Sequence, residues 1–179
     1  MKRSISILAI VVLSAGQVLL AQQLTADKAN SKIEIKGTSS LHDWESIANE
    51  YSISVTQSEN TLTNLKGTIK VKSIQSGKSI MDDKTYEALE ADKFPEIKME
   101  GTNLTIDNGK LTGSIQVTIK NVTKTFDIAS TSTVSGGNVK VNGEVPLDMT
   151  EFGIEPPTAM FGTLETGKDI TIAYSITLK

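Results

Sequence analysis

Three adjacent residues, His42, Asp43 and Trp44, carry the side chains best suited to chemistry in this sequence. An imidazole beside a carboxylate could act as a general acid or base, and an indole could pack against a ligand. Neighbouring residues of a strand point to opposite faces, however, so His42 and Asp43 make a poor dyad, and no nucleophile motif accompanies them. Two interpretations remain: His42 and Trp44 contact a ligand headgroup at a pore mouth, or Trp44 fills the core and His42 lies in a turn.

Composition excludes most other catalytic and cofactor chemistry. The chain has no cysteine, which excludes disulfides, cysteine-ligated zinc, iron–sulfur clusters and thiol catalysis, and a single histidine excludes a multi-histidine metal site in one chain. The acidic residues of 82–92 lack the spacing of an EF-hand loop and are typical of a solvated helix face. A net charge of −3 argues against nucleic acid as a partner. We therefore expect no cofactor and no bound metal.

The N-terminus has the pattern of a secretory signal peptide. Lys2 and Arg3 precede the apolar stretch 5–13, and the small residue Ala21 marks the expected cleavage site. The apolar stretch is too short for a membrane span, and Gln17 stands where a lipobox would need cysteine, which excludes a lipoprotein. The sequence thus predicts a signal peptide at 1–21, a mature domain at 22–179 without an integral span, and a periplasmic or secreted location. An uncleaved anchor helix is the alternative.

Apolar and polar residues alternate over most of residues 31–178, which predicts strands with one wet face. Turn signals separate the runs, and Asn108-Gly109 is the strongest of them. The pattern gives about eight strands, at 31–39, 46–56, 62–73, 96–106, 110–119, 124–133, 138–147 and 169–178. Long amphipathic strands joined by tight turns favour an all-β, eight-stranded antiparallel barrel, and the chain length suits one domain.

Two segments interrupt the alternation. Residues 79–92 have the pattern of a short helix, with Asp82 and Asp83 at its N-terminal end and Pro95 beyond its C-terminal end. Residues 148–168 form an irregular connection rich in apolar side chains. These side chains either line the entrance of a cavity or pack the two segments onto the barrel: Met81, Tyr86, Leu89, Phe94, Phe152, Ile154, Met160 and Phe161.

Short motifs in a fixed order resemble those of the YceI-like family of exported lipid-binding proteins. They are 31–35 (SKIEI), 65–69 (LKGTI), 73–77 (SIQSG), 93–97 (KFPEI), 111–113 (LTG) followed by 122–124 (VTK), and 149–154 (MTEFGI). No single motif is specific, but together they span nearly the whole mature chain. The resemblance implies a lipocalin-like, extended eight-stranded barrel that holds a long isoprenoid-type lipid, such as a prenyl lipid or an isoprenoid quinone, in an elongated pore.

The residues are consistent with that function. Strands of about eleven residues span roughly 35 Å, and burying hydrocarbon yields about 0.8 kcal/mol for each CH₂ group. We therefore expect a non-enzymatic carrier, monomeric or homodimeric, whose partner is an apolar lipid and whose polar end residues, such as His42 or Asp82, select the headgroup. Two alternatives stay open: a solidly packed interaction or stress-response module without lipid, and an enzyme that acts on a lipid headgroup through His42.

Overall fold

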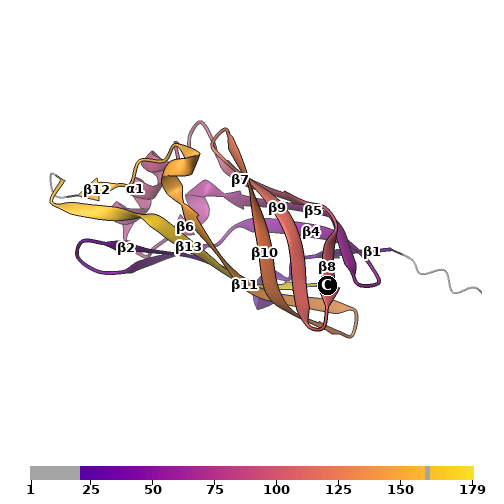
Figure 1. The fold of residues 1–179 in the computed structure, drawn as a ribbon. Coiled ribbons are helices and arrows are strands. Elements are labelled where there is room, and N and C mark those ends of the chain that lie inside the picture. Colours follow the sequence, from indigo (N-terminus) through magenta and orange to yellow (C-terminus); the bar gives the residue numbers. More distant parts are fainter. Residues whose placement is uncertain (1–20, 160–161) are drawn as a thin grey trace, which may run out of the picture.

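The computed structural model describes residues 21–159 and 162–179, and most of these residues are in β-strands. Antiparallel pairing joins the strands into one sheet in the order β1-β4-β5-β7-β9-β10-β11-β13-β2-β3-β6, with β8 on β5 and β9 and β12 on β13 (Figure 1). The predicted antiparallel all-β fold with one short helix is thereby confirmed. The strands are β1 (Gln22–Thr25), β2 (Lys32–Ser39), β3 (Trp44–Ala48), β4 (Tyr51–Ser58), β5 (Thr61–Lys70), β6 (Ile74–Gln75), β7 (Glu96–Gly101), β8 (Leu104–Asp107), β9 (Lys110–Ile119), β10 (Val122–Ser135), β11 (Asn138–Asp148), β12 (Thr158–Ala159) and β13 (Leu164–Leu178).

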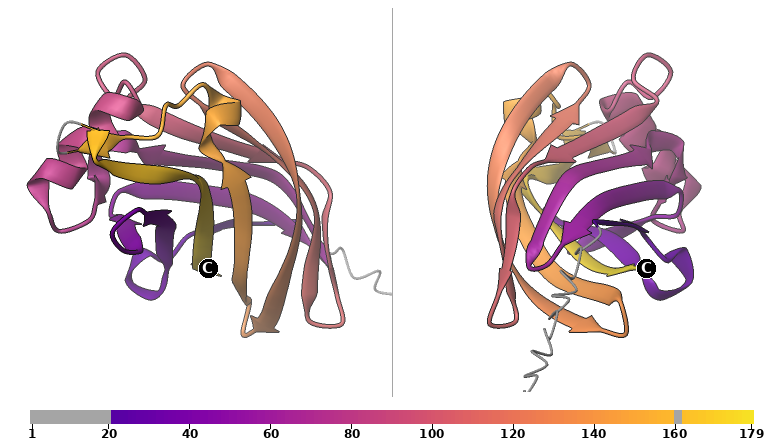
Figure 2. Two further views of the ribbon diagram at one scale, coloured as in Figure 1. Left: turned by 60° about the vertical axis from the view of Figure 1, so that its left-hand side comes forward. Right: turned by 90° about the vertical axis from the view of Figure 1, so that its right-hand side faces the viewer.

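The sheet bends around an elongated interior and closes near the C-terminus (Figures 1 and 2). There β1 pairs with β4, and Ala26, the first residue after β1, forms a bridge with Leu178 of β13. The backbones of Thr25 and Lys179 also exchange two hydrogen bonds of 2.9 Å. At the opposite end lie the β2–β3 hairpin, the helix α1 (Ser79–Ala88), the 3₁₀ turn η3 (Met149–Phe152) and β12. The fold therefore has one closed end and one end covered by loops and helices.

Alternation along each strand decides which side chains face the interior. On β9, Leu111 is buried while Thr112, Ser114 and Gln116 are exposed, and its partner β10 continues the same pattern over ten paired positions. Because side chains of a strand alternate between faces, one apolar face encloses the interior and one polar face meets water. The Asn108-Gly109 turn joins β8 to β9, as the sequence predicts.

Two of the expected strands are each divided in the structure. The expected strand 46–56 contains a turn at Asn49 and Glu50, whose backbone N–H groups donate to the backbone oxygen and the hydroxyl of Ser73. Ser73 lies in the 3₁₀ turn η2 (Val71–Ser73), which also ends the expected strand 62–73 at Lys70. The expected strand 96–106 breaks at Asn103, which has φ +57°. These breaks depend on residues that are distant in sequence or on left-handed asparagine, so alternation alone does not show them.

Helix α1 ends at Ala88, earlier than the expected residue 92. Glu90 takes a left-handed conformation with φ +49°, and the N–H of Ala91 donates to the carbonyl of Tyr86 at 2.9 Å. This is a Schellman C-cap with glutamate in the position where glycine is usual. Because the usual glycine is missing, the sequence gives no signal for this helix end. The other described helical turn, η1 (Lys28–Asn30), follows β1.

Candidate functional site

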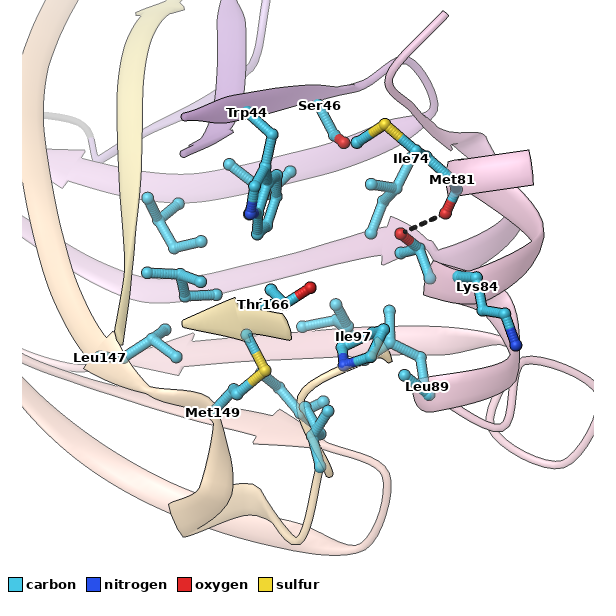
Figure 3. A pocket seen from close by; sticks show the side chains of 18 of the residues that line it. Trp44, Ser46, Ile74, Met81, Lys84, Leu89, Ile97, Leu147, Met149 and Thr166 are labelled. Atoms are coloured by element: carbon cyan, nitrogen blue, oxygen red, sulfur yellow. Dashed lines mark hydrogen bonds between the residues drawn. The ribbon is translucent and has the colours of Figure 1, made fainter. Parts of the chain in front are cut away.

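An apolar cavity of about 350 Å³ occupies the interior next to the end that carries α1 and η3 (Figure 3). Inward residues of β2, β3, β5, β6, β7, β9, β10, β11 and β13 form its wall, and residues of the β2–β3 loop, of α1, of 154–158 and of 164–166 form its mouth. Most of its lining is aliphatic: Ile33, Ile35, Leu41, Ile69, Ile74, Ile80, Ala88, Leu89, Ile97, Ile115, Val117, Ile119, Val145, Leu147, Ile154, Leu164, Ile170 and Ile172. A wall of this kind offers dispersion contacts to hydrocarbon and few hydrogen bonds to water.

The cavity is shorter than the strands that surround it. Along β13, Ile170, Ile172 and Tyr174 line it, but the next inward residues, Ile176 and Leu178, are buried in a continuous apolar cluster and do not. That cluster fills the interior at the closed end and contains residues with almost no exposure: Leu24, Val55, Leu62, Leu104 and Val139. The interior thus has a hollow part toward α1 and a packed part toward the C-terminus, whereas the sequence suggested a pore along the whole strand length.

The cavity contains few polar groups. Ser46 is buried at its wall, and Tyr174 and Ser130 share a hydroxyl–hydroxyl hydrogen bond of 2.6 Å at its inner limit. Burial raises the pKa of Tyr174, and the bond to Ser130 partly opposes that rise, so the phenol is neutral at physiological pH. Within residues 21–159 and 162–179, no three acidic or histidine side chains are grouped to hold a metal ion. What this lining can do chemically is to bind apolar molecules.

The mouth exposes large apolar side chains beside charged ones. Leu41 of the β2–β3 loop is 67% exposed and Ile80 of α1 is 75% exposed, and both line the cavity entrance. Lys84 also lines the entrance, and Figure 3 shows its side chain leading outward from α1. Its ammonium lies 2.9 Å from the carboxylate of Glu87. The rim therefore combines an apolar path inward with charged and polar groups.

His42 and Trp44, the predicted ligand contacts in the β2–β3 hairpin, both line the cavity. The indole N–H of Trp44 donates to the backbone oxygen of Thr38 at 3.0 Å, which fixes the ring over the inner side of β2 (Figure 3). His42 lines the rim, and its Nδ1 lies 2.7 Å from the backbone oxygen of Asp43. His42 is thus bonded to the Asp43 backbone, and its ring is available to a ligand through its other nitrogen.

The predicted residues of the two covering segments divide into two groups. Met81, Leu89 and Ile154 line the cavity. Tyr86 donates its hydroxyl to the backbone oxygens of Lys72 and Ile74 and so anchors α1, outside the lining.

Two aromatic residues also lie outside the lining. Phe94 contacts the Lys93 ammonium, which lies 4.8 Å from its ring centre. Phe152 is 1% exposed and stacks on Phe126, a lining residue, with ring centres 6.2 Å apart. Met160 and Phe161 lie outside the described residues.

Sequence reasoning did not name the strand residues that make most of the wall. Their signal was present in the alternation: Ile115, Val117 and Ile119 were recognised as one face of an expected strand. The alternation does not show whether opposite side chains meet across the interior, so it cannot predict a cavity. Met99 and Met149, one on β7 and one in η3, gave no signal as lining residues at all.

An ion pair fixes η3 beside the cavity. One carboxylate oxygen of Asp148 accepts from the N–H of Thr150 at 2.9 Å and from its hydroxyl at 2.5 Å, and the other accepts from Lys168 at 2.5 Å. These bonds lower the pKa of Asp148 from 3.8 to about 2, and the bond from Lys168 contributes most to that lowering. Asp148 therefore caps η3 and ties it to β13.

A comparison with protein families identifies this architecture. The YceI-like domain model matches residues 24–178, which is almost all of the described chain. The chain belongs to the YceI-like domain family. The resemblance that the short motifs indicated is thereby confirmed. A search of the curated proteins finds none that matches this YceI-like chain. Within its described residues, no helix has the length and apolar character required to cross a membrane.

Solved structures share the fold of this YceI-like domain. Burkholderia cenocepacia BcnA superimposes with a TM-score of 0.73 at 17% identity, over 85% of this chain and 98% of that one. A polyisoprenoid binding domain from Saccharophagus degradans, implicated in plant cell wall breakdown, gives a TM-score of 0.65 at 9% identity, over 87% and 97%. The YceI protein of Campylobacter jejuni gives 0.61 at 18% identity, over 72% and 80%. At these identities the likeness concerns the fold.

Proposed function

We propose that this protein is a non-enzymatic binding or carrier protein for an isoprenoid-type lipid, such as a prenyl lipid or an isoprenoid quinone. The observation that carries the proposal is the aliphatic cavity, which opens at one end of the fold and has about 350 Å³. That volume falls within the roughly 300–1,000 Å³ typical of pockets for small molecules. Each CH₂ group that enters contributes about 0.8 kcal/mol, so a few isoprene units outweigh the entropy lost on binding.

The comparisons support a lipid as the occupant. The chain is a YceI-like domain, and one structural neighbour is named a polyisoprenoid binding domain. In this proposal the hydrocarbon lies against the aliphatic wall, with Trp44, Met81, Leu89 and Ile154 among its contacts. His42 contacts the headgroup at the rim. Asp82 is less suited to that role, because one of its carboxylate oxygens accepts two hydrogen bonds of 2.7 Å from Ser76.

The proposal includes a periplasmic or secreted location, with residues 1–21 removed as a signal peptide. The family match begins at residue 24, and β1 begins at Gln22, directly after the expected cleavage site. Outside the cytoplasm, a lipid that does not dissolve in water needs an apolar container, which the cavity provides. The intact mass of the protein exported from its host tests this part: loss of residues 1–21 is expected, and an uncleaved mass would contradict it.

The decisive experiment is mass spectrometry of an organic extract from the purified, undenatured protein, followed by uptake of a prenyl alcohol or quinone by the delipidated protein. We expect an isoprenoid in the extract and saturable uptake. Ile172→Trp, which places an indole in the cavity, should abolish both. Val134→Ser, which removes an apolar side chain that is 50% exposed and outside the cavity lining, should change neither. A clean extract together with no uptake would refute the proposal and favour a packed interaction module.

A further inference from the structure

The inner limit of the cavity coincides with four inward-facing glycines. Each glycine is the next inward residue after the last lining residue of its strand: Gly67 after Ile69 on β5, Gly101 after Met99 on β7, Gly113 after Ile115 on β9 and Gly143 after Val145 on β11. Side chains of a strand alternate between faces, so each glycine leaves a gap in the inner wall at this level. We call these four residues the glycine ring.

The gap at Gly143 is filled by the side chain of Tyr174. These two residues are opposite each other in the pairing of β11 with β13. A Cβ atom at Gly143 would lie only 2.6 Å from the Tyr174 hydroxyl and 2.8 Å from its ring carbon Cζ. The hydroxyl continues to Ser130 on β10. The phenol ring therefore extends from β13 across β11 to β10, inside the sheet, where it covers the packed end of the interior.

The gap at Gly67 is filled in the same way by Met99. The two residues are opposite each other in the pairing of β5 with β7, and a Cβ atom at Gly67 would lie 2.7 Å from the Met99 methyl. Both Met99 and Tyr174 line the cavity on one side and pack against the buried cluster on the other. They are therefore the floor of the cavity, and the missing side chains at Gly67 and Gly143 are what let them lie across it.

We propose that the floor formed by Tyr174 and Met99 limits the length of the apolar chain that this protein accepts, so that it selects short prenyl chains over long polyprenyl chains. This inference rests on the proposed lipid-binding function and specifies its ligand class. A chain that enters at the mouth meets the floor and stops there, because the interior beyond is filled by side chains such as Leu104 and Val139, which have 0% exposure. The remainder of a longer chain must stay in water.

The test is a binding series with the delipidated protein and all-trans prenyl alcohols: geraniol, farnesol, geranylgeraniol and solanesol. Dissociation constants come from native mass spectrometry and from the emission of Trp44, the only tryptophan, which lines the cavity. Affinity should rise roughly fourfold for each additional methylene equivalent that enters the cavity, and then stop rising once the chain reaches the floor. Affinity that still rises through solanesol would overturn the inference.

Tyr174→Ala should move that limit to a chain longer by about one prenyl unit, because the deleted phenol ring has a bulk similar to that of an isoprene unit. Ile176→Ala is the matched control: it lies on the same strand one inward position deeper, is 6% exposed, and opens a void beneath an intact floor. The chain-length limit of Ile176→Ala should equal that of the wild type. Met99→Ala tests the other half of the floor and replaces Tyr174→Ala if that variant does not fold.

The outcomes separate this inference from the proposed function. A wild-type protein that binds none of the four alcohols refutes the lipid-binding function itself. A wild-type protein that binds them, with the same length limit in Tyr174→Ala and Met99→Ala, leaves the function standing and refutes the floor. A limit that moves in Ile176→Ala as far as in Tyr174→Ala also refutes it, because the packed end would then be open to the ligand.

Discussion

The position of Trp44 depends on the absence of a side chain at Gly37. These residues are opposite each other in the pairing of β2 with β3. A Cβ atom at Gly37 would lie 2.3 Å from the indole carbon Cζ2, so the ring lies directly on the glycine. The hydrogen bond from the indole to Thr38 holds it there. A large aromatic residue at the mouth thus lies flat against the wall, which leaves the entrance open.

Gly37→Ala is therefore expected to displace the indole into the cavity entrance. Forcing a methyl group into a packed contact costs about 1–3 kcal/mol of stability, part of which is relieved when the ring rotates away. The expected results are a shift of the Trp44 emission maximum and weaker uptake of farnesol. Lys36→Ala, at the exposed neighbouring position of β2, is the control and should change neither. Unchanged emission and uptake in Gly37→Ala would show that the ring is not held against β2.

At the scale of elements, η3 is attached to the wall of the cavity by the carboxylate of Asp148. Met149, the next residue, lines the cavity, and Lys168 connects the same carboxylate to β13. The lowered pKa of Asp148 has a defined consequence for stability. A carboxyl group whose pKa is lower in the folded state stabilises the fold above its usual pKa, and this contribution is lost as the pH falls toward the folded-state pKa.

We predict that η3 loosens as the pH falls from 3.8 to about 2, the interval between the usual and the folded-state pKa of Asp148. Asp148→Asn keeps an acceptor for the Thr150 N–H but loses the charge that pairs with Lys168. The difference in thermal midpoint between wild type and variant should therefore be largest above that interval and shrink within it, since all other carboxyl groups are common to both. If the plots of thermal midpoint against pH for the two proteins stay parallel down to pH 2, the assigned role of Asp148 is contradicted.

Elements could be predicted from the sequence where the signal is local. The strand over 110–119 follows from the Asn108-Gly109 turn and strict alternation, and the structure has β9 at Lys110–Ile119. The helix end and the strand breaks could not be predicted, because the C-cap uses Glu90 instead of glycine and the turn at Asn49 is bonded to Ser73. For the cavity, too, only the local features could be predicted. Alternation indicates that Ile115 and Gly143 face inward, but only the register reveals that Tyr174 covers Gly143.

At the scale of the whole molecule, the two parts of the interior serve different purposes. The packed end contains most of the fully buried side chains and joins the first described strand to the last. Most of the lining residues of the hollow end are half-buried, and a ligand that fills it adds stability according to its concentration relative to its dissociation constant. We therefore expect the fold to remain intact while the cavity is empty, as the proposed carrier function would require.

The same bulky substitution should consequently affect stability very differently in the two parts. Val117 is half-buried and lines the cavity, whereas Val139 has 0% exposure in the packed cluster. Val117→Trp should keep the free energy of unfolding within about 1 kcal/mol of the wild-type value. It should also lose lipid binding, because the indole occupies space that the ligand would fill. Val139→Trp should lower the free energy of unfolding by about 3 kcal/mol or more, because no space exists for the ring and its neighbours must leave their rotamers. Denaturant unfolding of both delipidated variants measures the difference. Equal destabilisation would mean that side chains also meet across the part of the interior described as hollow, and the cavity could then hold no lipid.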